Sequence, residues 1–199
     1  MASAEPVTIA ALGDSLTQGY GLPPDQGFVP QLQRWLDTNG EEVVLINAGV
    51  SGDTTAGGLS RVGWTLTDDV DALIVALGGN DILRGIDPGV VRNNLDGILK
   101  EATARGVPVL LVGMDAPSNY GAEYEAEFEA IYPELAEVYG ALHHDNFLSA
   151  LAALEDREMA VERYMQPDRI HPNADGVALI VEDLGPLVAK LAAEVPISN

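Results

Sequence analysis

The 199-residue sequence contains no cysteine, which excludes disulfide bonds, thiolate nucleophiles and cysteine-ligated zinc. It also has few basic residues, 10 lysines and arginines against 31 aspartates and glutamates, which gives a formal net charge of −21. Such a charge is unfavourable for binding nucleic acids or anionic membrane surfaces. No apolar run approaches the ~20 residues that a membrane-spanning helix needs. We therefore expect one globular domain over residues 1–199, a monomer with no nucleic-acid partner and no membrane insertion.

The amino-terminal residues bear on where the protein acts. They show no charged segment followed by an apolar one, so the sequence itself shows no signal peptide. Ala2, Ser3 and Ala4 nevertheless match the small-residue pattern that precedes signal cleavage. We therefore expect the mature form of a periplasmic or secreted protein, with the cytoplasm as the alternative.

Short apolar runs alternate with amphipathic segments along the chain. The runs are nearly continuous rather than alternating, which is typical of strands covered on both faces. They cover residues 7–12, 43–48, 72–77 and 107–112, with a weaker fifth run at 141–143. Apolar residues at helical spacing occupy residues 28–36 and 91–99 between them. This alternation predicts an α/β fold, a three-layer α/β/α sandwich around a five-stranded parallel sheet.

The last helix is expected to start after Pro172. Asn173 is a suitable residue to cap its amino terminus. Further along, Gly185 and Pro186 are expected to break or kink it, because proline lacks the N–H that a helix interior requires.

Glycine-rich polar turns follow the first three predicted strands, at residues 13–16, 47–53 and 78–81. In open parallel sheets, ligands bind beyond the carboxyl ends of the strands, so the three turns predict a site at one edge. Asp14, Asp53 and Asp81 lie in these turns. We interpret them mainly as structural residues that accept hydrogen bonds from nearby backbone.

Ser15 stands at the first of these turns, where a serine is commonly a helix cap. A serine becomes a nucleophile when a base takes its proton and a third group orients that base. His171 lies in a loop with prolines on both sides, and Asp168 precedes it by three residues. The Asp168 carboxylate can reach the Nδ1 proton of His171, which leaves Nε2 free for Ser15. This spacing makes Ser15, His171 and Asp168 candidate catalytic residues.

Acyl transfer also needs hydrogen-bond donors for the oxyanion of the tetrahedral intermediate. The backbone N–H groups of Ser15 and Gly52 are candidates, since glycine allows a ligand to approach the backbone closely. Asn80 offers a side-chain amide at the end of the third strand.

Four short blocks of this sequence, in this order, resemble those of the SGNH (GDSL) hydrolases. They are Gly13-Asp14-Ser15-Leu16, Gly52, Gly78-Gly79-Asn80-Asp81 and Asp168-x-x-His171. Within that superfamily the sequence is most similar to the bacterial multifunctional thioesterase, arylesterase and lysophospholipase group. The resemblance implies a flavodoxin-like sheet, Ser15 as nucleophile with Asp168 and His171, and an oxyanion hole of Ser15, Gly52 and Asn80. It also implies that no metal or organic cofactor is needed.

The function that we predict is serine ester hydrolysis through an acyl-enzyme. Its expected substrates are small molecules: aryl esters, short-to-medium acyl esters, thioesters or lysophospholipids. One alternative is a carbohydrate O-acetylesterase with the same triad, and another is a non-catalytic binding module with the same fold. The residues expected to contact substrate are Asp14, Asp81, Arg84, Asp115, Pro117 and Ile170.

Overall fold

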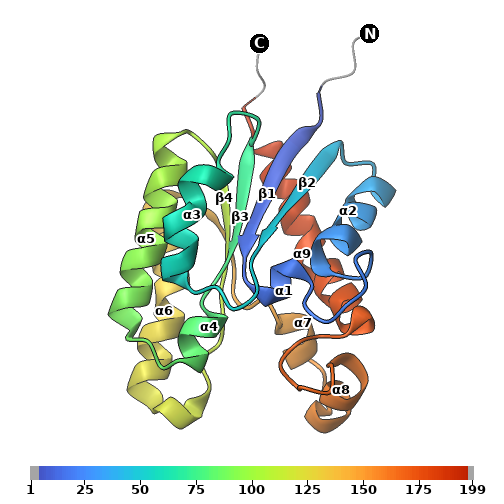
Figure 1. Cartoon of the computed structure of the whole chain (residues 1–199), viewed down its shortest axis with the longest axis vertical. Helices are drawn as coiled ribbons and strands as arrows, with labels where there is room; N and C mark the ends of the chain where they lie inside the picture. The colour runs from blue at the N-terminus through green and yellow to red at the C-terminus, as the bar shows by residue number, and fades with distance from the viewer. Residues whose placement is uncertain (1–4, 197–199) are drawn as a thin grey trace.

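The computed structural model describes residues 5–196, so the small residues at positions 2–4 lie outside the described part. Its centre is a sheet of five parallel strands in the order β2-β1-β3-β4-β5 (Figure 1). The strands are β1 (Val7–Gly13), β2 (Val43–Gly49), β3 (Ala72–Ala76), β4 (Val109–Val112) and β5 (Leu142–His144). The predicted flavodoxin-like order is confirmed. The fourth strand is shorter than predicted and the fifth lies one residue later.

Helices cover the sheet on both faces, so the predicted three-layer sandwich is also confirmed. On one side lie α3, α5 and α6, and on the other α2 and α9 (Figure 1). The helices on the first side are α3 (Thr55–Thr65), α5 (Pro88–Ala104) and α6 (Ala122–Tyr139). The short helix α4 (Gly79–Leu83) precedes α5, and the 3₁₀ turn η1 (Ser118–Tyr120) precedes α6. The others are α1 (Ser15–Gln18), α2 (Phe28–Thr38), α7 (Ser149–Ala152), α8 (Arg157–Tyr164) and α9 (Ala174–Ala193).

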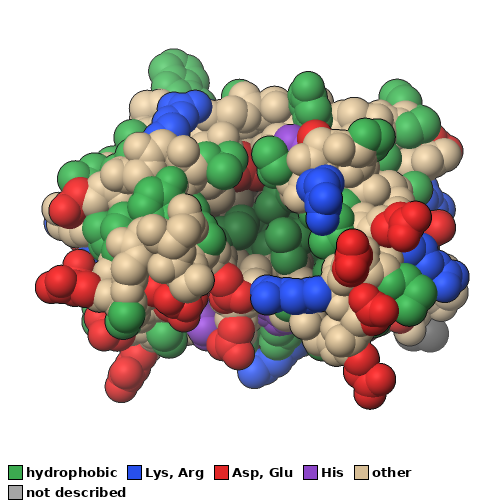
Figure 2. Space-filling model, turned by 90° about the horizontal axis from the view of Figure 1, so that it is seen from below, with side chains coloured by type: hydrophobic (Ala, Val, Ile, Leu, Met, Phe, Trp, Pro, Cys, Tyr) green, Lys and Arg blue, Asp and Glu red, His purple; other side chains and the backbone are tan. Residues whose placement is uncertain are grey.

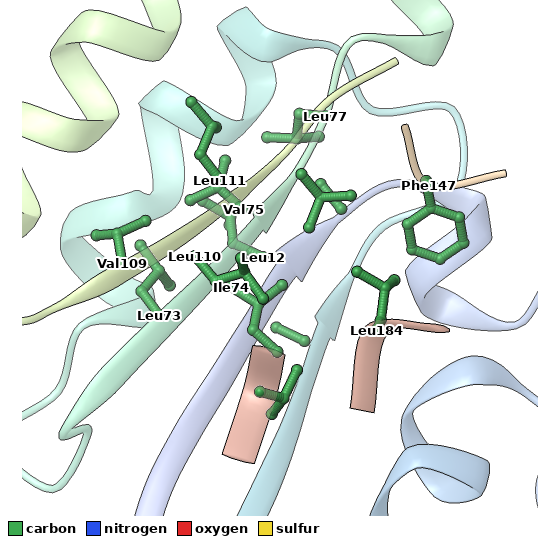
Figure 3. Packing of buried hydrophobic residues seen from close by; sticks show 14 of the residues in the cluster. Leu12, Leu73, Ile74, Val75, Leu77, Val109, Leu110, Leu111, Phe147 and Leu184 are labelled. Carbon is green, nitrogen blue, oxygen red and sulfur yellow. The ribbon is translucent and has the colours of Figure 1, made fainter. Parts of the chain in front are cut away.

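The hydrophobic core consists of the central strands and the inner faces of these helices. Every residue of β3 and of β4 is buried, as the continuous apolar runs predict. Figure 3 shows side chains of β1, β3 and β4 packed together, with Leu184 of α9 and Phe147, which lies between β5 and α7, beside them. This core fixes the carboxyl ends of the strands, where the polar turns begin.

The edge strand β2 differs from the prediction that both strand faces are covered. Val44 and Ile46 are 45% and 37% exposed, and β2 lies at the edge of the sheet. The free side of the strand is instead covered locally by Gln33 of α2. Its amide donates to the Val43 carbonyl and accepts from the Leu45 N–H, both at 2.8 Å, and so occupies groups that another strand would use.

The expected break in the last helix is wrong, since α9 runs through Gly185 and Pro186 without interruption. Asn173 does cap this helix, accepting a hydrogen bond from the Gly176 N–H. A proline removes only one hydrogen bond, and the buried face of α9 holds the helix together across that gap. Gly185 has a packing role, because a Cβ there would lie 2.7 Å from the ring of Trp35. Within residues 5–196, no helix has both the length and the apolar character needed to cross a bilayer.

Candidate active site

Ser15 lies at the end of β1, where the chain turns sharply into the short helix α1. Gly13 makes this turn possible, because a Cβ there would lie 2.0 Å from Thr17 Oγ1. Asp14 caps the helix by accepting a hydrogen bond from the Leu16 N–H at 3.0 Å. The turn holds Ser15 in a largely buried position, with 8% of the residue exposed.

His171 and Asp168 come from the loop between α8 and α9 and meet Ser15 across the carboxyl edge of the sheet. Ser15 Oγ lies 2.8 Å from His171 Nε2, and His171 Nδ1 lies 2.7 Å from Asp168 Oδ2. Asp168 Oδ1 also accepts hydrogen bonds from the backbone N–H groups of Ile170 and His171, each at 3.0 Å. The structure therefore brings together the three residues that the sequence singles out as candidates.

The charge of Asp168 determines how the imidazole is oriented. Hydrogen bonds from the His171 side chain, and then from the backbone of His171 and Ile170, lower the pKa of Asp168 to about 2. The carboxylate is thus ionised near neutral pH and accepts the proton on His171 Nδ1. The lone pair of Nε2 then faces the Ser15 hydroxyl, which is the arrangement that allows histidine to take a proton from serine.

Three hydrogen-bond donors lie at the ends of neighbouring strands around Ser15. The N–H groups of Ser15 and Gly52 donate no hydrogen bond within the described residues 5–196. Asn80 donates one amide hydrogen to Asp14 Oδ2 at 3.1 Å, which leaves its second amide hydrogen available. These residues follow β1, β2 and β3, which are adjacent in the sheet.

Asp14 and Asp81 are predicted substrate contacts that the structure does not permit. Asp14 is 2% exposed and Asp81 is completely buried, so neither carboxylate is accessible to a substrate. Asp81 accepts hydrogen bonds from the Thr55 N–H at 2.9 Å and the Thr55 hydroxyl at 2.7 Å. Burial is the main influence on both groups. It raises the pKa of Asp81, and it raises the pKa of Asp14 from 3.8 to about 6 despite hydrogen bonds from Leu16 and Asn80.

The other predicted substrate contacts lie on the surface. Arg84 follows α4, and its guanidinium donates to the Gly52 carbonyl at 2.8 Å. Asp115 and Pro117 are exposed in the segment after β4, where Asp115 accepts a hydrogen bond from Asn146. Ile170 is 48% exposed and directly precedes His171. Of these four residues, Ile170 adjoins the triad candidates. Arg84 contacts the loop between β2 and α3 that contains Gly52, called the Gly52 loop below.

The structure adds two sets of contacts around the site, those of Tyr20 and those of Arg61, that the sequence does not specify. The Tyr20 ring lies 4.8 Å from the His171 ring, measured between centroids. Arg61 of α3 pairs with Asp53 at 2.7 Å and donates to the carbonyls of Ala48 and Gly13 at 2.6 and 2.9 Å. Arg61 thereby ties the ends of β1 and β2 to the Gly52 loop. The only signal for Tyr20 is its place in the glycine-rich turn after Ser15, and the spacing of Arg61 gives none.

Comparison with known proteins identifies the family. The model of the GDSL-like lipase/acylhydrolase family matches residues 11–179, which include the three polar turns and the histidine loop. The chain belongs to this family.

Named relatives of the chain indicate the class of reaction. The chain is 36% identical over 185 residues to esterase TesA of Pseudomonas aeruginosa, covering 92% of this chain and 89% of that protein. It is 33% identical over 187 residues to thioesterase 1/protease 1/lysophospholipase L1 of Escherichia coli K12, covering 91% and 85%. The crystal structure of the esterase EstA from Pseudoalteromonas sp., inhibited by monoethylphosphonate, superimposes with a TM-score of 0.83 at 31% identity, covering 92% and 97%. The protein is accordingly an esterase or thioesterase of the family.

The surface around the site suits an apolar substrate group. Figure 2 views the side of the molecule on which the strands end, and shows a hollow with hydrophobic side chains on its floor. Apolar side chains next to site residues are also exposed: Tyr20 by 50%, Leu83 by 61% and Ile170 by 48%. Leu83 follows Asn80 by three residues, and the other two adjoin His171.

Proposed function

We propose that the protein hydrolyses carboxylic esters through a covalent acyl-enzyme on Ser15. The observation that carries the proposal is the unbroken chain of hydrogen bonds from Asp168 Oδ2 through His171 to Ser15 Oγ, at 2.7 and 2.8 Å. His171 Nε2 takes the hydroxyl proton as Oγ attacks the acyl carbon, and Asp168 stabilises the imidazolium that forms. The protonated His171 then gives its proton to the leaving alcohol or thiol. Water, activated by the same histidine, releases the acid and regenerates Ser15.

The oxyanion of each tetrahedral intermediate is bound by the N–H groups of Ser15 and Gly52 and by the free amide hydrogen of Asn80. These donors are supported by their position at the ends of adjacent strands and by their lack of other acceptors in residues 5–196. Fixed donors of this kind stabilise the transition state because they need no reorganisation as charge develops.

The substrates of this reaction are aryl esters and short-to-medium acyl esters, with thioesters and lysophospholipids as further members of the class. The apolar side chains of Tyr20, Leu83 and Ile170 beside the site support an acyl or aryl group. A carbohydrate would instead need many polar partners, so this surface does not favour the alternative of a carbohydrate O-acetylesterase. The names of the relatives, esterase and thioesterase/lysophospholipase, support the same substrate class.

The mechanism is tested by replacing Ser15 with alanine and measuring p-nitrophenyl ester hydrolysis. We expect Ser15→Ala to be folded and inactive, because no other serine among residues 5–196 forms a hydrogen bond with the His171 ring. Ser149→Ala is the matched control. The Ser149 hydroxyl and the His144 ring both contact Asp183, so this serine also lies near a histidine and an aspartate. Here, however, the serine hydroxyl donates to the aspartate and not to the histidine. The control should keep full activity.

Covalent labelling gives an independent measurement. An alkyl fluorophosphonate should add once, at Ser15, as found by mass spectrometry of the digested protein. A label elsewhere, or activity retained by Ser15→Ala, would show that the acyl-enzyme is not formed on Ser15. A panel of p-nitrophenyl esters, acyl-CoA thioesters and an acetylated sugar then defines the substrate. Hydrolysis of the sugar alone would favour the O-acetylesterase, and no turnover of any substrate would favour a binding module.

A further inference from the structure

The Gly52 loop contains an oxyanion donor on a residue with little conformational restraint of its own. Gly52 has a φ of +80°, a region that glycine occupies readily and other residues rarely do. Its neighbours are held: Asp53 pairs with Arg61, and the Thr55 backbone donates to Asp81. The Asp53 N–H also donates to the Val50 carbonyl at 3.0 Å, which closes a turn around Gly52, and a contact to Gly52 itself adds a further restraint.

Arg84 supplies that contact. Its Nη2 donates to the Gly52 carbonyl at 2.8 Å, and no other hydrogen bond in residues 5–196 joins Gly52 to a different element. Arg84 is itself fixed at the end of α4, where its N–H is shared between the carbonyls of Asn80 and Asp81, each at 3.2 Å. The segment 80–84 therefore carries one oxyanion donor, Asn80, and the group that restrains another, Gly52.

We propose that Arg84 is a positioning residue that fixes the Gly52 N–H toward the oxyanion. The proposal rests on the acyl-enzyme mechanism proposed above and assigns Arg84 a role other than the predicted contact with substrate. The guanidinium holds the Gly52 carbonyl, which is joined to the Gly52 N–H through the Cα, and its positive charge remains close to the loop whose N–H faces the developing oxyanion of the substrate. Its effect should therefore appear in the transition state and not in substrate binding.

The test compares Arg84→Ala, Arg84→Lys and Arg84→Gln with Arg92→Ala on a neutral p-nitrophenyl ester. Arg92 is an arginine of α5 that pairs with Glu134, so its removal changes the charge equally without affecting the Gly52 loop. We expect Arg84→Ala to lower kcat by about 10- to 100-fold, less than the ~10²–10³-fold of a lost oxyanion donor, with KM changed by less than about threefold. Arg84→Lys should retain more activity than Arg84→Gln, because it keeps a cationic donor.

Two further measurements separate positioning from a general effect on the fold. The rate of phosphonylation of Ser15 should fall in parallel with kcat, since that reaction also places negative charge at the oxyanion position. Guanidinium ion at millimolar concentration should restore part of the kcat of Arg84→Ala, and should not change that of Asn80→Ala. Folding of each variant is checked by its thermal midpoint.

Ser15→Ala is measured in parallel, so that failure of this inference is distinguishable from failure of the mechanism. Activity in Ser15→Ala overturns the mechanism. If Ser15→Ala is inactive and Arg84→Ala behaves as Arg92→Ala does, the positioning role alone is overturned. A rise in KM at unchanged kcat would likewise overturn it, in favour of contact between Arg84 and substrate. A lower kcat that guanidinium does not restore, together with a lowered thermal midpoint, would also overturn it.

Discussion

Replacing Asp14 with asparagine should remove a specific part of the pH dependence of stability. Asp14 is 2% exposed, and burial raises its pKa from 3.8 to about 6. The folded protein thus binds a proton at Asp14 more tightly than the unfolded chain does. The stability that Asp14 contributes in its protonated form is complete below pH 3.8, falls as pH rises between the two pKa values and is lost above about pH 6.

The magnitude follows from these pKa values. A tenfold difference in proton affinity corresponds to ~1.4 kcal/mol, so ionised Asp14 destabilises the fold by about 3 kcal/mol at alkaline pH. Much of that change lies below pH 5. Between pH 5 and pH 7.5, linkage gives a loss of about 1.4 kcal/mol in the free energy of unfolding. The Asp14→Asn variant cannot ionise at this position and should not show this loss.

The assay is urea unfolding of the wild type and of Asp14→Asn at several pH values between 5 and 7.5. The difference in unfolding free energy between the two proteins should shift by about 1.4 kcal/mol in favour of the variant across this range. Asp68→Asn is the matched control, since it removes the same charge from an exposed side chain that makes no hydrogen bond in the described structure. If the difference in unfolding free energy between Asp14→Asn and the wild type changes with pH no more than that of Asp68→Asn, the reasoning is refuted.

The same substitution should reduce activity. The carboxylate accepts from the Leu16 N–H with one oxygen and from the Asn80 amide with the other. An amide has only one oxygen, so one of these two donors would then face an N–H group. We expect kcat to fall by about tenfold or more with little change in KM, because Asn80 is needed chiefly in the transition state.

Three other predictions follow from the structure. Asn80→Ala should lower kcat by ~10²–10³-fold with little change in KM; a higher KM at unchanged kcat would contradict its role as an oxyanion donor. Gly185→Ala should destabilise the fold by about 1–2 kcal/mol in urea despite alanine's better helix propensity, because the new Cβ would lie 2.7 Å from the Trp35 ring; unchanged stability would mean that the ring moves at no cost. For substrates, the net charge of −21 should disfavour anionic acyl-CoA relative to a neutral aryl ester with the same acyl group. The kcat/KM for the aryl ester divided by the kcat/KM for acyl-CoA should fall by ~10-fold between 0.01 and 1 M salt. A quotient independent of salt would rule out the long-range field as the cause of the preference.

The sequence predicted the sheet well because its central strands are buried on both faces. Continuous apolar runs leave few alternatives for β3 and β4, and the intervening amphipathic segments imply right-handed crossovers between parallel strands. The errors fall where tertiary contacts decide. An apolar run does not reveal that β2 is an edge strand with exposed side chains. A glycine-proline pair likewise does not reveal a helix that continues through both residues.

The candidate site divides in the same way. Ser15, Asp168 and His171 could be predicted because a short turn brings the acid to the histidine and the strand order brings both to the serine. The contacts that support these three residues could not be predicted from the sequence. Arg61 and Arg84 reach carbonyl groups 13 and 32 residues away in the chain, and nothing in linear spacing specifies such contacts. The burial of Asp14 and Asp81 is equally a property of the assembled turns.

These supporting contacts have a common physical reason. A donor for an oxyanion must be fixed in direction, and it must have no other acceptor, so its own hydrogen bond cannot fix it. Neighbouring groups must then hold the donor from behind: Asp14 holds the Asn80 amide, and Arg84 holds the Gly52 carbonyl. Asp14 is buried where it accepts from the Asn80 amide, so its ionisation destabilises the fold. Asp14→Asn should accordingly gain relative stability as pH rises while it loses turnover. For Arg84, which is exposed, substitution should lower turnover with little effect on stability. The contrast between these two variants separates the effect of burying a charge from the effect of fixing a donor.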